Sequence, residues 1–399
     1  MTDEIRAKYE AWLNEKTISD IERVELFSLK EDEIIDRFGS ELDFGTAGIR
    51  GVMGVGTNRM NKYIIRKVTQ GLSNYLKKIT KNPCVCIAYD SRNNSEAFAK
   101  EAAAVLATNE IPVYIFSELT PVPMLSFAVR KLGCTAGIVI TASHNPKQYN
   151  GYKVYNSDGC QLNIEDANMV SSEISRLDTF KDVNITSFVE SLMNGFVAYV
   201  PKLVIDSYYN SVSSQSIVGH SVPRILKITY SPLNGSGLKP VCTVLKMDGF
   251  SFDKVSVVEE QKHPDGNFTT CPYPNPETKE AMELGTKLML KNNDDILIAT
   301  DPDADRVGVV VNVNGSPVSL TGNEVGILLF DFIVNMRKET QTLPANPVVV
   351  KTIVSSDLVN IIAEAKKLEV REVLTGFKYI GGVIADLEAK GEEKRFLLG

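Results

Sequence analysis

The stretch VCIAYDSRNNSEAFAKEAAAVLATNEIPVYIF, residues 85–116, contains an apolar strand, a polar turn, an alanine-rich helix and a second apolar strand. The same pattern returns at residues 224–258 and again at 347–374. Strands that alternate with helices indicate an α/β fold, in which helices cover a mostly parallel sheet. Because the pattern recurs along the chain, the sequence predicts three repeated α/β domains with mixed, mostly parallel sheets.

In the first two repeats a further strand follows, AGIVITASHNP at 136–146 and DILIATDPDAD at 295–305, and each runs into a polar loop that another strand follows. The equivalent strand of the third repeat is expected at RFLLG, residues 395–399, where the sequence stops. We therefore expect a fragment whose third domain is incomplete. Functional groups of α/β sheets lie on loops beyond the strand ends, so both polar loops are candidate sites.

The repeats divide the chain into three expected domains. Residues 1–205 combine a helical N-terminal extension with the first repeat, residues 206–320 contain the second, and residues 321–399 the third. Thr321 and Glu324 have the spacing of a capping box, which marks the first helix of the third domain. The apolar residues expected to pack the N-terminal extension are Trp12, Leu13, Leu26 and Phe27.

The composition indicates an acidic globular protein. The 399 residues are 43% hydrophobic, which suffices for several cores, and the formal charge of −7 argues against a general nucleic-acid partner. Apolar runs are too short to cross a membrane, and the charged first residues do not resemble a signal peptide. Six cysteines in so long a chain do not form a disulfide framework, so a reducing, cytoplasmic location is expected. No feature of the sequence specifies an oligomeric state.

Asp301, Asp303 and Asp305 occupy alternate positions in the loop that follows the strand DILIAT, residues 295–300. In an extended backbone residues two apart point to the same side, so these carboxylates would converge and repel one another without a cation. Oxygen-only ligands favour Mg²⁺ or Ca²⁺. An EF-hand is excluded, because Arg306 and Asn312 stand where it needs glycine and glutamate. The alternative, a solvated acidic turn, is disfavoured by the apolar strands on both sides.

Arg306 directly follows this acidic loop. Its planar guanidinium suits a phosphate group, and the alternative is that it balances the charge of the aspartates.

Ser143 lies at the end of the other apolar strand, where Pro146 keeps Asn145 out of the helical region and the hydroxyl is presented at the strand tip. No G-x-S-x-G pattern is present, and the side chain of His144 is expected to point away from Ser143, so a hydrolase triad is not indicated. Ser143 could instead carry a phosphoryl group and, once phosphorylated, bind the metal ion. Lys153, in the following strand, is either an acid/base or phosphate partner or an exposed strand lysine.

Three further motifs carry weaker signals. DFGTAGIRGVMG, residues 43–54, offers backbone amides and Arg50 to an anion, although such runs are often only turns. YSPLNGSG, residues 230–237, is interpreted as a plain link between strand and helix. TGFKYIGG, residues 375–382, places Lys378 in an apolar and aromatic loop that would suit the face of a sugar. Alternatively, Lys378 extends its ammonium group to solvent.

The motifs FGTAGIRG, TASHNP, NGYK, DPDADR and TGFKYIG occur in this order, and together they resemble the α-D-phosphohexomutases over nearly the whole chain. The N-terminal extension is similar to the long phosphoglucomutase and phosphopentomutase branch. The resemblance implies four domains around one cleft, of which the fourth would be missing here. It also implies Ser143 as the phosphoserine and Lys153 as its acid/base. Mg²⁺ would be bound by Asp301, Asp303, Asp305 and the phosphate on Ser143.

By the same resemblance, Arg50 and Arg306 would contact the phosphoserine region. The residues grouped as substrate-binding are Arg306, His144, Thr375, Gly376 and Lys378, of which the last three would face the sugar.

The implied activity is a phosphoglucomutase that interconverts glucose 1-phosphate and glucose 6-phosphate through the phosphoserine and glucose 1,6-bisphosphate. Mannose or pentose phosphates are alternative substrates. A phosphosugar-binding regulator and a metal-dependent phosphatase are alternatives of other classes. Because the family continues past FLLG into sugar- and phosphate-binding parts, this chain alone is expected to have low mutase activity.

Overall fold

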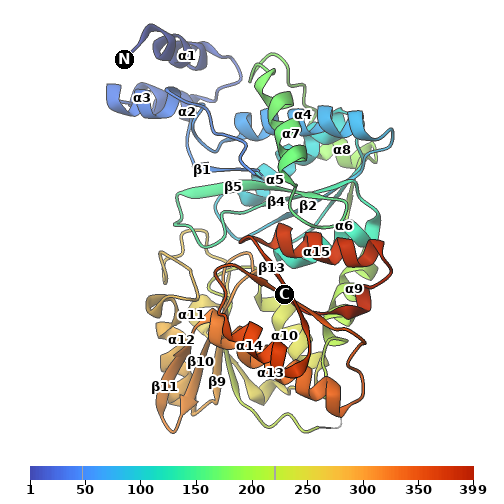
Figure 1. Cartoon of the computed structure of the whole chain (residues 1–399). Coiled ribbons are helices and arrows are strands. Elements are labelled where there is room, and N and C mark those ends of the chain that lie inside the picture. Colours follow the sequence, from blue (N-terminus) through green and yellow to red (C-terminus); the bar gives the residue numbers. More distant parts are fainter. Residues whose placement is uncertain (47, 220–221) are drawn as a thin grey trace. The chain divides into compact units, whose positions relative to one another are not determined.

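The computed structural model describes residues 1–46, 48–219 and 222–399 (Figure 1). The chain forms two compact units. The first comprises residues 1–201 together with 265–268, and the second comprises residues 202–264 and 269–399. One sheet belongs to the first unit, and two sheets are described in the second.

The sheet of the first unit has the strand order β1-β5-β4-β2-β3-β6. Strands β4, β2, β3 and β6 are parallel, whereas β1, β5 and β4 pair in antiparallel fashion. Every residue of β2 and β4 is buried, which explains why both read as uninterrupted apolar runs. The strand bounds are β1 Gly48–Val52, β2 Val85–Tyr89, β3 Val113–Ile115, β4 Ala136–Ile140, β5 Tyr149–Asn156 and β6 Val197–Tyr199.

Helices cover both faces of this sheet. Helix α5 packs on β2, β3 and β4, with α4 and α8 beside it and α7 against α4, and α6 packs on β2 and β4 from the other side (Figure 1). The side chain of Asn61 caps α4, and the apolar residues at helical spacing along it, such as Ile64, Val68 and Leu72, are buried. The bounds are α4 Lys62–Ile79, α5 Ser95–Thr108, α6 Val122–Leu132, α7 Ile164–Ser175 and α8 Phe188–Met193.

The N-terminal extension forms α1 Asp3–Asn14, α2 Asp20–Phe27 and α3 Glu31–Phe38. Trp12 anchors it, with ring centroids 5.8 Å from Phe38, 5.4 Å from Tyr63 and 5.1 Å from Phe180. The prediction for Phe27 was wrong, because this side chain is 69% exposed whereas Leu26 is fully buried. Leu26 lies on the side of α2 that faces the core, whereas Phe27 points about 100° further round the helix and faces solvent.

The second unit begins with α9 Lys202–Ser213 and then repeats the architecture of the first. Its first sheet has the order β11-β10-β9-β7-β8, with β9, β7 and β8 parallel. Helix α12 covers β7, β9 and β10. The bounds are β7 Ile228–Ser231, α10 Leu238–Met247, β8 Val255–Val257, α11 Glu259–Lys262, α12 Lys279–Asn292, β9 Ile296–Thr300, β10 Val307–Val313 and β11 Ser316–Leu320.

The third sheet is parallel throughout, in the order β13-β12-β14. The elements of this third repeat are α13 Gly322–Glu339, β12 Val348–Thr352, α14 Leu358–Lys366, β13 Glu369–Val373, α15 Phe377–Ala389 and β14 Phe396–Leu398. The expected strand at RFLLG is therefore confirmed. It pairs with β12 as β4 pairs with β2 and as β9 pairs with β7. The capping box of Thr321 and Glu324 begins α13, as predicted.

The sheets of the first two repeats are mixed, as predicted, but the second is not mostly parallel, because β9, β10 and β11 are antiparallel neighbours. These strands are joined by short connections, and only antiparallel strands can be joined without a long crossover. The turn between β10 and β11 consists of Asn314 and Gly315, both at positive φ, as a two-residue hairpin requires. The repeated architecture is thus three α/β/α domains, of which the first two contain mixed sheets. Among the described residues, no helix is long and apolar enough to span a membrane.

Gly71 allows α4 and α7 to approach closely, because a Cβ there would lie 2.9 Å from the backbone N of Ile174. We expect Gly71→Ala to lower the free energy of unfolding by about 1–3 kcal/mol through overpacking. The matched control is Gly382→Ala in α15, where a Cβ meets nothing within 4 Å and helix propensity should add up to about 1 kcal/mol. Urea unfolding followed by circular dichroism measures both. Equal stability of the two variants would contradict this account of the α4–α7 contact.

Candidate active site

The Ser143 loop, residues 141–148, joins β4 to β5 and turns sharply at Ser143. Ser143 has a φ of +54°, in the left-handed region that costs a residue with a side chain roughly 1–2 kcal/mol. Its backbone N–H donates to Thr141 Oγ1 at 2.9 Å, and the Thr141 hydroxyl donates to Asp90 Oδ2 at 2.7 Å. The residue is only 4% exposed. Interactions with the surrounding loop therefore hold Ser143 in a conformation that it would not adopt alone.

His144 does not point away from Ser143, and the expectation from the sequence was wrong. The Ser143 Oγ and the His144 Nδ1 lie 3.1 Å apart, within hydrogen-bond distance. In an extended segment neighbouring side chains alternate, but the left-handed φ of Ser143 breaks this alternation. The structure thus brings an imidazole to the hydroxyl that the sequence singled out.

Strand pairing brings Arg50 and Lys153 to the same part of the first unit. Arg50 on β1 lies opposite Gly151, and Lys153 on β5 lies between Gly48 on β1 and Val139 on β4. Paired residues share a face of the sheet, and so do residues two apart, so Arg50 and Lys153 project from one face. Arg50 Nη1 donates to Asn145 Oδ1 at 3.2 Å, which ties β1 to the Ser143 loop.

Two glycines make this close pairing possible. A Cβ on Gly48, whose φ is +144°, would lie 1.9 Å from the carbonyl oxygen of Tyr152. A Cβ on Gly151 would lie 2.5 Å from the carbonyl oxygen of Thr141. The glycines of GTAGIRG and NGYK thus let backbone approach backbone beside the Ser143 loop.

Asp90 and Arg92 also belong to this site, although the sequence analysis did not single them out. Both side chains are fully buried, with Arg92 Nε 3.2 Å from Asp90 Oδ2. Burial raises the pKa of the Asp90 carboxyl, and the Arg92 guanidinium opposes that rise. Arg92 donates to the carbonyl oxygens of Ser143 and Asn145. A signal was present in the sequence, because charged residues directly after a fully apolar strand lie at the functional edge of a parallel sheet.

The acidic loop of the second unit gathers its carboxylates by a turn and not by the predicted extended alternation. The N–H of Ala304, which has a φ of +50°, donates to the carbonyl oxygen of Asp301 at 2.9 Å. The N–H of Arg306 donates to Asp301 Oδ1 at 3.1 Å. One oxygen from each of Asp301, Asp303 and Asp305 lies within 4.8 Å of the others. The prediction of convergence is confirmed, and the reason given for it was wrong.

The segment at residues 230–237 holds the acidic loop in place, in addition to linking β7 to α10. Ser236 donates from its backbone N–H and its hydroxyl to the carbonyl oxygen of Pro302, at 2.9 and 2.8 Å. A Cβ on Gly235 would lie 2.3 Å from the Cα of Pro302. This support requires a residue without a side chain at position 235, a role that sequence periodicity does not reveal.

The donor set of the acidic loop fits a hard divalent cation. Three carboxylates converge, Asp301 and Asp303 are fully buried, and oxygen ligands of this kind suit Mg²⁺. Arg306 lies beside the cluster, with its Nε 3.9 Å from Asp305 Oδ1. This contact fits charge balance and leaves its guanidinium partly exposed for a phosphate as well.

The third group of predicted residues lies at the start of α15. Thr375 and Gly376 form the turn before this helix, and Lys378 is in its first turn, with Nζ 5.0 Å from the ring centroid of Tyr379. The prediction of a loop at Lys378 was therefore wrong. Gly376, at a φ of +132°, is the helix N-cap and ends the irregular segment.

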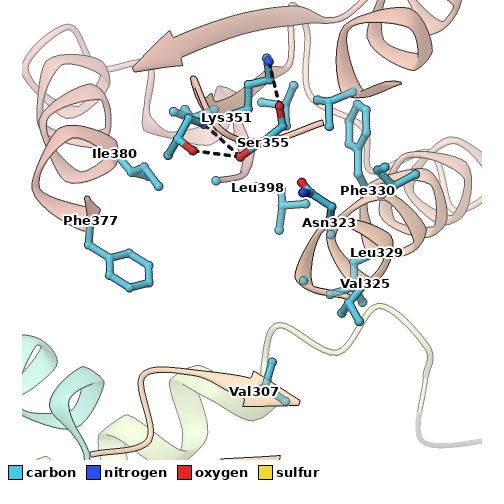
Figure 2. A pocket seen from close by; sticks show the side chains of 18 residues that line it. Val307, Asn323, Val325, Leu329, Phe330, Lys351, Ser355, Phe377, Ile380 and Leu398 are labelled. Atoms are coloured by element: carbon cyan, nitrogen blue, oxygen red, sulfur yellow. Dashed lines mark hydrogen bonds between the residues drawn. The ribbon is translucent and has the colours of Figure 1, made fainter. Parts of the chain in front are cut away.

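A pocket of about 410 Å³ lies beside α15 in the second unit. Figure 2 shows Phe377 and Ile380 on one side of it, Phe330 and Leu329 on the other, and Lys351 at the end of β12. The Lys351 ammonium is buried between Asp357 and Glu372, at 3.0 and 2.8 Å, and these hydrogen bonds raise its pKa. Of the described residues, Phe377 lines the pocket, whereas Thr375, Gly376 and Lys378 are not among its lining residues.

Three successive α/β/α domains, with polar loops at the ends of their parallel strands, define the class of protein to which this chain belongs. The family descriptions of the phosphoglucomutase/phosphomannomutase α/β/α domains I, II and III match residues 41–181, 206–315 and 321–393. The chain belongs to this family, the α-D-phosphohexomutases.

Curated relatives extend beyond the matched region. A phosphoglucomutase of Staphylococcus aureus strain MRSA252 is 38% identical over 352 residues, which are 88% of this chain and 62% of that protein. A phosphoglucomutase of the bovine strain RF122 is also 38% identical, over 354 residues and with the same coverage. The chain thus spans about three fifths of the length of these relatives.

Solved structures share the fold at lower identity. A phosphoglucomutase/phosphomannomutase family protein from Burkholderia thailandensis superposes with a TM-score of 0.68 at 20% identity, covering 87% of this chain and 69% of that one. The open form of parafusin, a phosphoglucomutase of Paramecium, gives a TM-score of 0.65 at 15% identity, covering 88% and 65%. These similarities support the α/β/α architecture described above.

Repulsion among the carboxylates predicts opposite effects of one substitution with and without a divalent ion. Asp303→Asn should raise the thermal midpoint in EDTA, because a buried negative charge is removed from the cluster. It should also abolish the stabilisation by Mn²⁺ or Mg²⁺ and weaken Mn²⁺ affinity by about tenfold or more, roughly 1.4 kcal/mol. Differential scanning fluorimetry and calorimetric Mn²⁺ titration measure these effects.

The control is Glu283→Gln, an exposed carboxylate on α12 that forms an ion pair with Lys287. It should leave both measurements unchanged. Mn²⁺ affinity that is equal in wild type and Asp303→Asn would exclude the acidic loop as a cation site.

Proposed function

We propose that the chain carries the phosphoryl-transfer machinery of a phosphoglucomutase, which interconverts glucose 1-phosphate and glucose 6-phosphate through a phosphoserine at position 143 and glucose 1,6-bisphosphate. The observation that carries the proposal is the Ser143 hydroxyl, held in a left-handed turn with an imidazole nitrogen 3.1 Å from its oxygen. A hydroxyl fixed in this way is suited to accept and return a phosphoryl group, since phosphoryl transfer depends chiefly on positioning and charge stabilisation.

In the proposed reaction, phosphorylated Ser143 transfers its phosphoryl group to a free hydroxyl of the sugar monophosphate. The P–O bond to Ser143 Oγ breaks as the bond to the sugar oxygen forms. Lys153, as the acid/base, takes the proton of the sugar hydroxyl and returns a proton to the departing Ser143 Oγ. The sugar bisphosphate then returns its other phosphoryl group to Ser143. Arg50, which already contacts the loop through Asn145, would supply positive charge to the phosphoryl oxygens, and His144 would orient the serine hydroxyl.

Asp301, Asp303 and Asp305 would hold Mg²⁺ together with the phosphate on Ser143, and the ion supplies charge neutralisation to the transferring group. Arg306 would bind a phosphate oxygen as a planar fork. Thr375, Gly376 and Lys378 would contact the sugar at the start of α15. The proposed ligand is a small phosphosugar. The proposed domains are residues 1–205, 206–320 and 321–399. The proposed location of the protein is the cytoplasm.

Covalent phosphorylation of Ser143 is the first test of this proposal. After incubation with glucose 1,6-bisphosphate and Mg²⁺, the intact mass should increase by one phosphoryl group, and peptide mapping should locate the group on Ser143. Ser143→Ala should abolish the gain, whereas Ser175→Ala, an exposed serine at the end of α7, should not change it.

The outcomes separate the competing classes. Release of inorganic phosphate with no phosphoprotein would support a phosphatase, and binding of the bisphosphate with no mass change would support a regulator. Either result would overturn the proposal.

Sugar preference provides the second test, because the family includes enzymes for other phosphosugars. We expect glucose 1-phosphate to remove the phosphoryl group from phosphorylated Ser143 at least roughly tenfold faster than mannose 1-phosphate or ribose 1-phosphate, a difference of about 1.4 kcal/mol in transition-state stabilisation. Quenched-flow mass spectrometry of the phosphorylated chain measures the three rates. A faster reaction with the mannose or ribose compound would replace phosphoglucomutase by phosphomannomutase or phosphopentomutase.

A further inference from the structure

Arg92 makes an unusually concentrated set of contacts with one loop. Its guanidinium donates to four backbone carbonyl oxygens within seven residues, those of Ser143, Asn145 at 2.6 Å, Pro146 at 3.2 Å and Tyr149 at 3.3 Å. The side chain is fully buried, so these hydrogen bonds do not compete with water. A planar group with several donors in fixed directions constrains the path of the backbone more than a single ammonium would.

Asp90 acts on the N–H side of Ser143, whose carbonyl oxygen Arg92 binds. Its carboxylate accepts hydrogen bonds from Ser95 Oγ, from the N–H of Arg92 and from Thr141 Oγ1, and the Thr141 hydroxyl oxygen accepts from the N–H of Ser143. The N–H of Ser143 is therefore held through Asp90, and its carbonyl oxygen is held by Arg92. Fixing both ends defines the left-handed φ of Ser143 and, with it, the direction of the Cα–Cβ bond that carries the hydroxyl.

Phe268 covers the face of the Arg92 guanidinium. Its ring centroid is 4.9 Å from Arg92 Cζ, and the ring is fully buried. A cation over an aromatic face gains stability, and more so away from water. The ring also excludes solvent from the guanidinium face, which keeps the hydrogen bonds to the loop strong.

The position of Phe268 in the sequence makes this contact informative. Residues 265–268 pack in the first unit, although the family's domain II description covers 206–315. Asn93 Nδ2 donates to Asn267 Oδ1 at 3.1 Å, and a Cβ on Gly266 would lie 2.6 Å from the backbone N of Asn93. A segment from a later domain is thus fitted closely beside the polar turn that carries Arg92.

We propose that Asp90, Arg92 and Phe268 form a clamp that positions the Ser143 hydroxyl for phosphoryl transfer, with the 265–268 segment as the part that completes it. This inference rests on the proposed function and adds positioning residues to it. If the clamp loosens, Ser143 can relax toward an ordinary φ and its hydroxyl moves from the line of transfer. A displacement of about 1 Å at a reacting atom can cost roughly 100-fold in rate.

Two substitutions test the clamp with matched controls. Arg92→Lys keeps the charge and loses the fork, and Phe268→Leu keeps an apolar side chain and loses the aromatic face. Arg66→Lys alters an arginine paired with Glu101, and Phe188→Leu removes another cation–π contact, that of Lys100, both in the first unit. The measurement is the single-turnover rate of Ser143 phosphorylation by glucose 1,6-bisphosphate, followed by intact mass at several concentrations.

Positioning predicts a loss of rate constant with little change in binding. The rate constant at saturation should fall roughly 10- to 100-fold in Arg92→Lys and by a smaller factor in Phe268→Leu. The concentration for half-saturation should stay within about twofold, as expected when an interaction acts only on the transition state. Both control variants should keep the wild-type rate constant.

Hydrogen exchange at residues 141–149 gives a readout that does not depend on the reaction. Exchange should be faster there in Phe268→Leu than in wild type and unchanged in Phe188→Leu, which keeps the clamp testable even if Arg92→Lys does not fold. Wild type that gains no phosphate refutes the proposed function, while the exchange data still report on the clamp. Phosphorylation of Phe268→Leu at the wild-type rate, or exchange equal to wild type, would overturn the inference.

Discussion

The buried pair of Asp90 and Arg92 is the interaction on which the Ser143 loop depends. Neither side chain reaches water, so each charge must be satisfied inside the protein. The Arg92 guanidinium donates to carbonyl oxygens within residues 143–149, and the Asp90 carboxylate accepts from Thr141 as well as from Ser95. A buried ion pair adds little net stability, because its desolvation is costly, but it specifies one arrangement of the groups around it. Here that arrangement includes a serine in a backbone conformation that few residues other than glycine adopt.

The three sheets place their loops by one geometric rule. In each, the strand that follows the strand–helix–strand repeat pairs in parallel with the first strand of that repeat, so that β4 lies beside β2, β9 beside β7 and β14 beside β12. The carboxyl ends of such strands lie at the same edge, and the loops that follow them share that edge. In the first unit this rule brings the turn with Asp90 and Arg92 to the Ser143 loop. In the second it brings the 230–237 segment to the acidic loop, where Ser236 binds Pro302.

Much of the fold could be predicted from the sequence because its signals are local. Fully apolar runs mark the buried strands, helical periodicity marks α4, and the spacing of Thr321 and Glu324 marks the start of α13. Ser143 and the three aspartates of the acidic loop were also found, since they follow strands β4 and β9, whereas Asp90 and Arg92 were not. The wrong predictions concern side-chain direction, backbone conformation and the start of a helix. His144 faces Ser143, the aspartates converge by a turn, and Lys378 lies in a helix. Each depends on a backbone angle or helix boundary that residue spacing does not specify.

The sequence by itself determined the three α/β repeats, the family and the position of the polar loops, because hydrophobic periodicity and short motifs are properties of neighbouring residues. Only the tertiary structure decided what holds those loops. Arg92 contacts carbonyl groups more than fifty positions away, and Phe268 reaches Arg92 from a later domain of the sequence. Contacts between residues so far apart leave no periodic trace in the chain, since they arise when packing brings separate strands and loops together.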